Sequence, residues 1–174
     1  IDFDYGLSSF SIETTLYNVR CVRGGIDEPE ASTPPHIILL VSDDVGFADL
    51  GVQGSNEFPS PAIDSIAANG VRFTQGYVAG PKCSPSRAGF LTGRYPQRFG
   101  HENNVEGQTG LPLTQTLIPA HLKSHGLNYR SYLVGKWHLG SQSQFLPNAR
   151  GFDEFFGFRG GSRSFFQIAN PNNG

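Results

Sequence analysis

The most marked hydrophobic pattern in the chain is an unbroken apolar run at residues 36–41, His-Ile-Ile-Leu-Leu-Val. A run of β-branched residues and leucines without polar breaks is typical of a strand buried on both faces, as in a parallel sheet. Residues 71–79 and 129–138 also have the composition of strands, and the second of these leads into a loop. We therefore predict strands over these three segments.

Polar and special residues between these runs predict helices. Ser60 suits an N-cap, Pro61 suits the first helical position and Gly70 suits the C-terminal cap. The helices that we expect cover residues 61–69, 84–92 and 114–125, the last stopped by Gly126 and with a start left open by Pro119.

The order strand, helix, strand, two helices, strand predicts an α/β fold with a mostly parallel sheet flanked by helices. Such sheets bind ligands at the carboxyl ends of their strands. Four polar residues lie at or just after the carboxyl ends of predicted strands, namely Asp43, Asp44, Lys136 and His138. We expect a functional site there.

The composition changes near residue 36. Residues 1–25 alternate aromatic, polar and β-branched types, and we expect them to be the tail of a separate upstream domain. Residues 26–35 are polar, acidic and proline-bearing, as in a linker. Residues 36–174 then form the main domain, and because the chain contains no methionine, we expect it to be a truncated fragment.

The overall charge excludes some classes of function. The 174 residues carry a net charge of −2, so no basic surface for nucleic acid or an anionic membrane is expected. The longest apolar run is too short to span a bilayer, which predicts no membrane span. Two cysteines permit at most one disulfide and do not fix the compartment.

Asp43 and Asp44 are adjacent carboxylates that repel each other unless a cation or a proton relieves them. Calcium and magnesium prefer clustered oxygen ligands, so the pair is a candidate metal site. A turn aspartate beside a solvated one is the alternative.

Cys83 lies at the predicted start of a helix, near Lys82 and Arg87, where a thiolate is favoured. The alternative is a small buried hydrophobe. A phosphatase-type cysteine loop needs arginine six residues after the cysteine, where Gly89 stands. Zinc is not expected, because no second cysteine lies at ligand spacing.

Lys136 and His138 are two residues apart, and such residues share a face in an extended segment. A cation beside an imidazole can hold an anion and move a proton. The alternative places Trp137 in the core with both polar side chains solvated. His101 and the pair His121 and His125 give weaker signals, the pair being typical of a surface helix.

Taken together, these stretches resemble the sulfatase family. Cys-Ser-Pro-Ser-Arg followed by a helix ending in Thr-Gly-Arg, at residues 83–94, is similar to its signature. Further similar stretches occur in the same order at residues 36–51, 59–78, 132–140 and 150–158. The resemblance covers about residues 36–165 and implies an alkaline-phosphatase-like fold.

The resemblance also implies residue roles. Cys83 would be oxidised to formylglycine by a formylglycine-generating maturation enzyme, which recognises Pro85 and Arg87. Asp43, Asp44 and the modified Cys83 would hold calcium. Arg87 would hold the hydrated aldehyde, Lys136 would bind sulfate oxygens and His138 would help to deprotonate the second hydroxyl.

The implied function is a sulfuric ester hydrolase, a sulfatase that acts on sulfated carbohydrates or aryl sulfates. Further metal ligands, a leaving-group acid and a lysine are expected beyond Gly174, so we expect the chain alone to be inactive. A phosphonate or phosphodiester hydrolase of the same superfamily is one alternative, and a non-catalytic glycan-binding remnant is another. Sulfated glycans are usually external, so a periplasmic or secreted location is expected. Residues 17–25 also resemble the closing strand of C-type-lectin-like domains.

Overall fold

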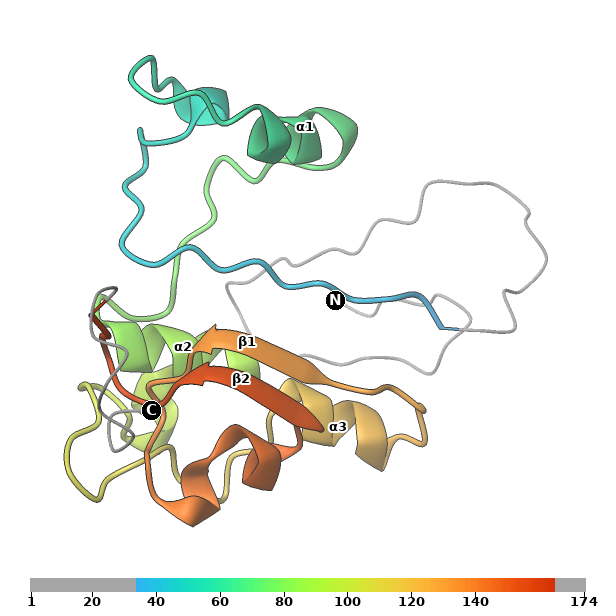
Figure 1. Ribbon diagram of the computed structural model, residues 1–174, viewed down its shortest axis with the longest axis vertical. Helices are drawn as coiled ribbons and strands as arrows, with labels where there is room; N and C mark the ends of the chain where they lie inside the picture. The colour runs from blue at the N-terminus through green and yellow to red at the C-terminus, as the bar shows by residue number, and fades with distance from the viewer. Residues whose placement is uncertain (1–33, 165–174) are drawn as a thin grey trace. The chain divides into compact units, whose positions relative to one another are not determined.

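The computed structural model describes residues 34–164, which form parts of two compact units (Figure 1). The smaller unit includes residues 34–76 and the larger one residues 77–164, and each is described by itself. The proposed upstream tail, residues 1–25, and nearly all of the proposed linker, residues 26–35, lie outside the described residues.

The smaller unit contains a short 3-10 helix, η1 (Gly51–Gln53), and the helix α1 (Pro61–Asn69). The bounds of α1 confirm the predicted helix. Ser60 does not cap α1 with its side chain; its hydroxyl accepts from the Gly51 amide at 2.8 Å and donates to Asp64 at 2.9 Å. Asp64 also accepts from the Val52 amide at 2.8 Å, so polar contacts join α1 to η1.

The two predicted strands at residues 36–41 and 71–79 are absent from the described structure, so these predictions were wrong. The side chains of Ile38 and Leu40 are 82% and 75% exposed. A strand exists only where a neighbouring strand satisfies its N–H and C=O groups. No strand lies within residues 34–76 to provide that pairing.

The larger unit holds the remaining elements. They are α2 (Cys83–Thr92), η2 (Pro96–Phe99), α3 (Ile118–Ser124), β1 (Tyr132–Lys136), η3 (Ser143–Phe145), η4 (Pro147–Arg150) and β2 (Glu154–Phe158). α2 ends at Gly93, whose left-handed φ of 65° suits glycine. Figure 1 shows α2 near the carboxyl ends of the strands and α3 near their beginnings. None of the helices described is long and apolar enough to cross a membrane.

β1 and β2 form a parallel pair in which Val134 faces Phe156 and Lys136 faces Phe158. β2 begins at Glu154, directly after Asp153. The described sheet has these two strands, and the larger parallel sheet expected from the sequence is not formed in residues 34–164. The parallel direction itself agrees with the prediction.

The core of the larger unit centres on Trp137, which is 1% exposed. Its ring meets Phe152 edge-on, with 6.1 Å between centroids, and its N–H donates to the carbonyls of Gly140 and Phe145 at 3.1 and 3.0 Å. The other buried apolar members are Ala88, Leu91, Leu111, Leu117 and Leu139. Full burial of a leucine side chain contributes about 1.5–3 kcal/mol to the free energy of unfolding.

The third predicted helix begins later than expected, at Ile118 rather than residue 114. Pro119 stands in its first turn, whereas a start at residue 114 would place the proline inside the helix. The loop before α3 is held by Arg150, which is 6% exposed and donates to three of its backbone carbonyls. Its guanidinium donates to Leu111 at 2.9 Å, to Gln115 at 2.7 Å and to Pro112 at 3.3 Å. Burial lowers the pKa of Arg150 below its usual value.

Replacement of Arg150 by alanine should leave the buried carbonyls of Leu111 and Gln115 without this donor, whereas the Pro112 carbonyl still accepts from the Gln115 amide at 3.0 Å. At roughly 1 kcal/mol for each of these two unsatisfied groups, the free energy of unfolding should fall by about 2 kcal/mol in urea titrations. The matched control is Arg130→Ala, which removes a 3.4 Å ion pair between exposed side chains of Arg130 and Glu154 and should cost less than about 1 kcal/mol. Equal losses from the two variants would contradict this assignment.

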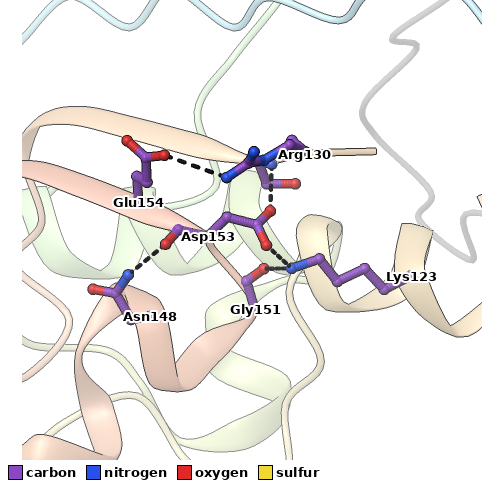
Figure 2. A network of polar contacts seen from close by, with 7 residues as sticks. Lys123, Arg130, Asn148, Gly151, Asp153 and Glu154 are labelled. Carbon is purple, nitrogen blue, oxygen red and sulfur yellow. Dashed lines mark hydrogen bonds and ion pairs between the residues drawn. The ribbon is translucent and has the colours of Figure 1, made fainter. Parts of the chain in front are cut away.

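A polar network ties α3 to the start of β2 (Figure 2). Lys123 Nζ lies 2.8 Å from Asp153 Oδ1 and 2.9 Å from the Gly151 carbonyl oxygen. Asp153 also accepts from the Ser131 amide at 2.7 Å and, through its own carbonyl, from Asn148 at 3.0 Å. The hydrogen bond from Lys123, with that from the Ser131 amide, lowers the pKa of the Asp153 carboxyl.

Because the pKa of Asp153 is lowered in the folded state, its contribution to stability should be full above the unfolded pKa of about 3.9. It should be lost as the pH falls through the lower folded-state value. In chemical unfolding at a series of pH values, Asp153→Asn should therefore be less stable than the native protein at pH 7, with the gap closing below about pH 4. A gap that widens on acidification would refute this.

Candidate active site

Cys83 is the first residue of α2, and its thiol is free and partly buried. The chain enters the helix through Lys82 in an extended conformation, and Pro85 fits in the first turn, where its missing N–H costs nothing. Cys83 thus lies at an accessible helix start, while Ser84 and Pro85 beside it are buried.

Arg87, one turn further along α2, connects this helix to β1. Its guanidinium donates to the backbone carbonyl of Lys136 at 2.6 Å. Arg87 and Lys136 are both partly buried. The structure thereby brings the helix of Cys83 to the end of the strand that leads to His138.

His138 is buried, 8% exposed, and has a left-handed backbone with φ of 56°. A positive φ is uncommon outside glycine and marks a locally strained position. The extended geometry therefore ends at Lys136, and the face-sharing rule used in the sequence prediction does not apply at His138. The alternative was right for Trp137, which packs in the core, but wrong for His138, which is not solvated.

The segment that follows β2 forms a wall beside His138. The His138 amide donates to the Arg159 carbonyl at 3.0 Å. A Cβ atom added to Gly161 would lie 2.7 Å from Cε1 of His138, whereas one added to Gly160 would meet its nearest atom at 4.0 Å. Only glycine fits between the chain and the imidazole at position 161.

A shallow pocket of about 180 Å³ opens next to His138. Its polar lining includes Glu106, Thr109, Ser141 and Arg159, with Gly160 and Gly161 completing one side. Next to the imidazole, the pocket therefore offers hydrogen-bond donors and acceptors, among them the acidic Glu106 and the basic Arg159. Such groups suit a polar ligand.

His101, which gave only a weak signal in the sequence, lies against the start of α2. Its Nε2 lies 2.7 Å from the hydroxyl of Ser84, and the two side chains are 6% and 0% exposed. Burial lowers the pKa of His101, and the nearby charge of His138 lowers it further. The polar sequence His-Glu-Asn-Asn was the available signal, but only the fold shows that it lies against α2.

Asp43 and Asp44 belong to the smaller unit and Cys83 to the larger one. Both aspartates are exposed, in a bend after residues 36–41, and Asp44 has a left-handed φ of 55°. The shared metal site of these three residues stays a prediction. His121 on α3 and His125 directly after it pack ring to ring, with 4.3 Å between centroids, as expected of a surface helix.

Comparison with known proteins identifies this arrangement. Residues 35–173 match the model of the family described as Sulfatase. The chain is 46% identical over 143 residues to N-acetylgalactosamine-6-sulfatase of Sus scrofa, covering 76% of this chain and 27% of that protein. It is 42% identical over 132 residues to arylsulfatase A of Bos taurus, covering 73% of this chain and 26% of that protein.

A solved structure agrees with these matches. The crystal structure of Ps i-CgsB in complex with k-i-k-neocarrahexaose superimposes with a TM-score of 0.68 at 42% identity, covering 71% of this chain and 28% of that one. The chain thus spans about a quarter of the length of these relatives. With a family match over most of its residues and more than 40% identity to several members, the chain belongs to the sulfatase family.

Proposed function

We propose that the protein is a sulfuric ester hydrolase whose reacting group is a formylglycine made from Cys83. The observation that carries this proposal is the hydrogen bond from Arg87 to the Lys136 carbonyl. It joins the helix that begins with Cys83 to the segment that carries Lys136 and His138. An electrophilic residue, two cations and an imidazole are a set suited to a sulfate ester.

When residue 83 carries formylglycine, one hydroxyl of its hydrated aldehyde would attack the sulfur and displace the alcohol of the ester, a case of covalent catalysis. Deprotonation of the second hydroxyl would then re-form the aldehyde C=O bond and release sulfate. Arg87 extends from the same helix, four residues on, and is suited to orient the hydrated group. The start of α2 also favours negative charge through the helix dipole.

Lys136 and His138 have separate roles in the proposed reaction. The Lys136 ammonium is suited to attract sulfate oxygens. The His138 imidazole can take a proton from the hydroxyl that releases sulfate, since histidine is the usual proton carrier near neutral pH. Its burial and its contact with Gly161 hold the ring in one orientation.

Asp43 and Asp44 are the proposed calcium ligands of this chain, together with the modified residue 83. Two adjacent exposed carboxylates provide oxygen ligands, which fit a hard cation. The thiol of Cys83 does not suit calcium, but an oxygen in its place does. When bound, the ion would neutralise sulfate charge and lower the pKa of the attacking hydroxyl.

Sulfated carbohydrates are the proposed substrates. The relatives include an N-acetylgalactosamine-6-sulfatase and a protein crystallised with a neocarrahexaose. The pocket beside His138, with its polar lining, is compatible with a hydroxylated ring. A formylglycine-generating enzyme is the proposed maturation partner, residues 36–174 are the proposed share of the catalytic domain, and a periplasmic or secreted location is proposed.

Co-expression of the full-length gene product with a formylglycine-generating enzyme should lower the mass of the tryptic peptide spanning Cys83 by about 18 Da. The same preparation should hydrolyse an aryl sulfate, and Cys83→Ala should abolish the activity. An unmodified thiol, or faster hydrolysis of an aryl phosphodiester than of the sulfate, would contradict the proposal.

Gly161→Ala should displace the imidazole of His138, because the new methyl group would lie within 2.7 Å of the ring. We expect kcat for an aryl sulfate to fall by about 10- to 100-fold, since a shift of 1 Å in a reacting group can have such an effect. Gly160→Ala is the matched control, with open space for a methyl group, and should retain its kcat. Equal activity of the two variants would contradict the proposed role of His138.

A further inference from the structure

A second segment of the larger unit closes around the start of α2. Residues 101–104, His-Glu-Asn-Asn, reach the helix through three side-chain contacts. Lys82 Nζ donates to Asn103 at 2.7 Å, the Ser84 amide donates to Asn104 Oδ1 at 3.1 Å, and the Ser84 hydroxyl lies 2.7 Å from His101 Nε2. These contacts fall on the residues immediately before and after Cys83.

The contact from Asn104 acts as a helix cap supplied from a distance. The first N–H groups of a helix have no partner within the helix, and a serine, aspartate or asparagine at the N-cap usually accepts one of them. Here the N-cap residue is Lys82, whose side chain cannot accept and makes no capping bond. The side-chain oxygen Oδ1 of Asn104, 20 residues away, accepts a hydrogen bond from the Ser84 N–H in its place.

The contact from His101 fixes the side chain of Ser84. Both groups are buried, so the loss of either would leave the other without its partner in a dry environment. Burial lowers the pKa of His101, which favours the neutral imidazole. A neutral ring has one donor and one acceptor nitrogen, so Nε2 can pair with a hydroxyl in either tautomer.

We propose that His101 and Asn104 are positioning residues, which hold residue 83 in the orientation that the reaction requires. They act through Ser84 and need not touch the substrate. The amide and the hydroxyl of Ser84 are both held, while Cys83 next to it is only partly buried. The backbone at residue 83 is thus anchored, and its side chain is left accessible. The catalytic consequence rests on the proposed function.

The test compares variants that keep or remove each hydrogen bond in the full-length, matured protein. His101→Gln places an amide nitrogen near the position of Nε2 and should preserve the bond, whereas His101→Ala removes it. Asn104→Asp keeps an acceptor oxygen, whereas Asn104→Ala does not. His125→Ala is the control for loss of an imidazole, because His125 is exposed and lies directly after α3.

We expect kcat per mole of aldehyde on an aryl sulfate to fall about 10- to 100-fold in His101→Ala and Asn104→Ala, with KM little changed. The conservative variants and His125→Ala should stay within about 3-fold of the native value. Ser84→Ala should lower kcat by a similar factor. The double variant with His101→Ala should lose no more than either single variant, because both substitutions remove the same contact. Equal kcat in His101→Ala and His101→Gln, or multiplicative losses in the double variant, would overturn the proposal.

Hydrogen exchange separates this inference from the proposed function. The Ser84 amide should exchange faster in Asn104→Ala and in His101→Ala than in the native protein, and at the native rate in the conservative variants. Unchanged exchange in both alanine variants would overturn the positioning role whether or not the protein is a sulfatase. If the matured native protein has no sulfatase activity while the exchange results are as expected, only the proposed function and its catalytic consequence are refuted.

Discussion

The parallel pairing of Lys136 with Phe158 determines where the chemically active parts of the larger unit meet. Parallel strands end at the same edge, and here the hydrogen bonding continues beyond both strands, from Trp137 to Phe158 and from His138 to Arg159. Arg87 then adds α2 to that edge by binding the Lys136 carbonyl. A one-residue shift of this register would move Trp137 out of the core and His138 away from Gly161. Core packing and site geometry therefore both depend on the register of the two strands.

Signals that act within one element were read correctly from the sequence. The observed bounds of α1, α2 and β1 lie close to the predicted ones. The local signals were the proline and glycine around α1, the pattern of α2 and the apolar residues of β1. The two missing strands at residues 36–41 and 71–79 failed for a different reason. Their hydrophobic pattern describes residues that would be buried if a partner were present, and pairing depends on other strands, which a local pattern does not contain.

Only some features of the candidate site could be predicted from the sequence. Cys83, Arg87 and Lys136 could be proposed from the sequence because the signature and the strand end are each continuous segments. The conformation of His138 could not, since neither its left-handed backbone nor the closeness of its ring to Gly161, 23 residues later, has a local sequence pattern. His101 was undervalued because its contact with Ser84 crosses 17 residues and is buried. Residues whose roles depend on a distant neighbour carry no local pattern.

The burial of Ser84 has a consequence for how the signature tolerates change. A motif written as cysteine, any residue, proline, serine, arginine leaves this position open, yet in this chain the side chain is fully buried and hydrogen-bonded to His101. A larger residue at position 84 would have to displace the imidazole, and an apolar one would leave it without a partner. Positions 84 and 101 are therefore expected to vary as a pair among homologues, so that transplanting one motif into another member requires both residues.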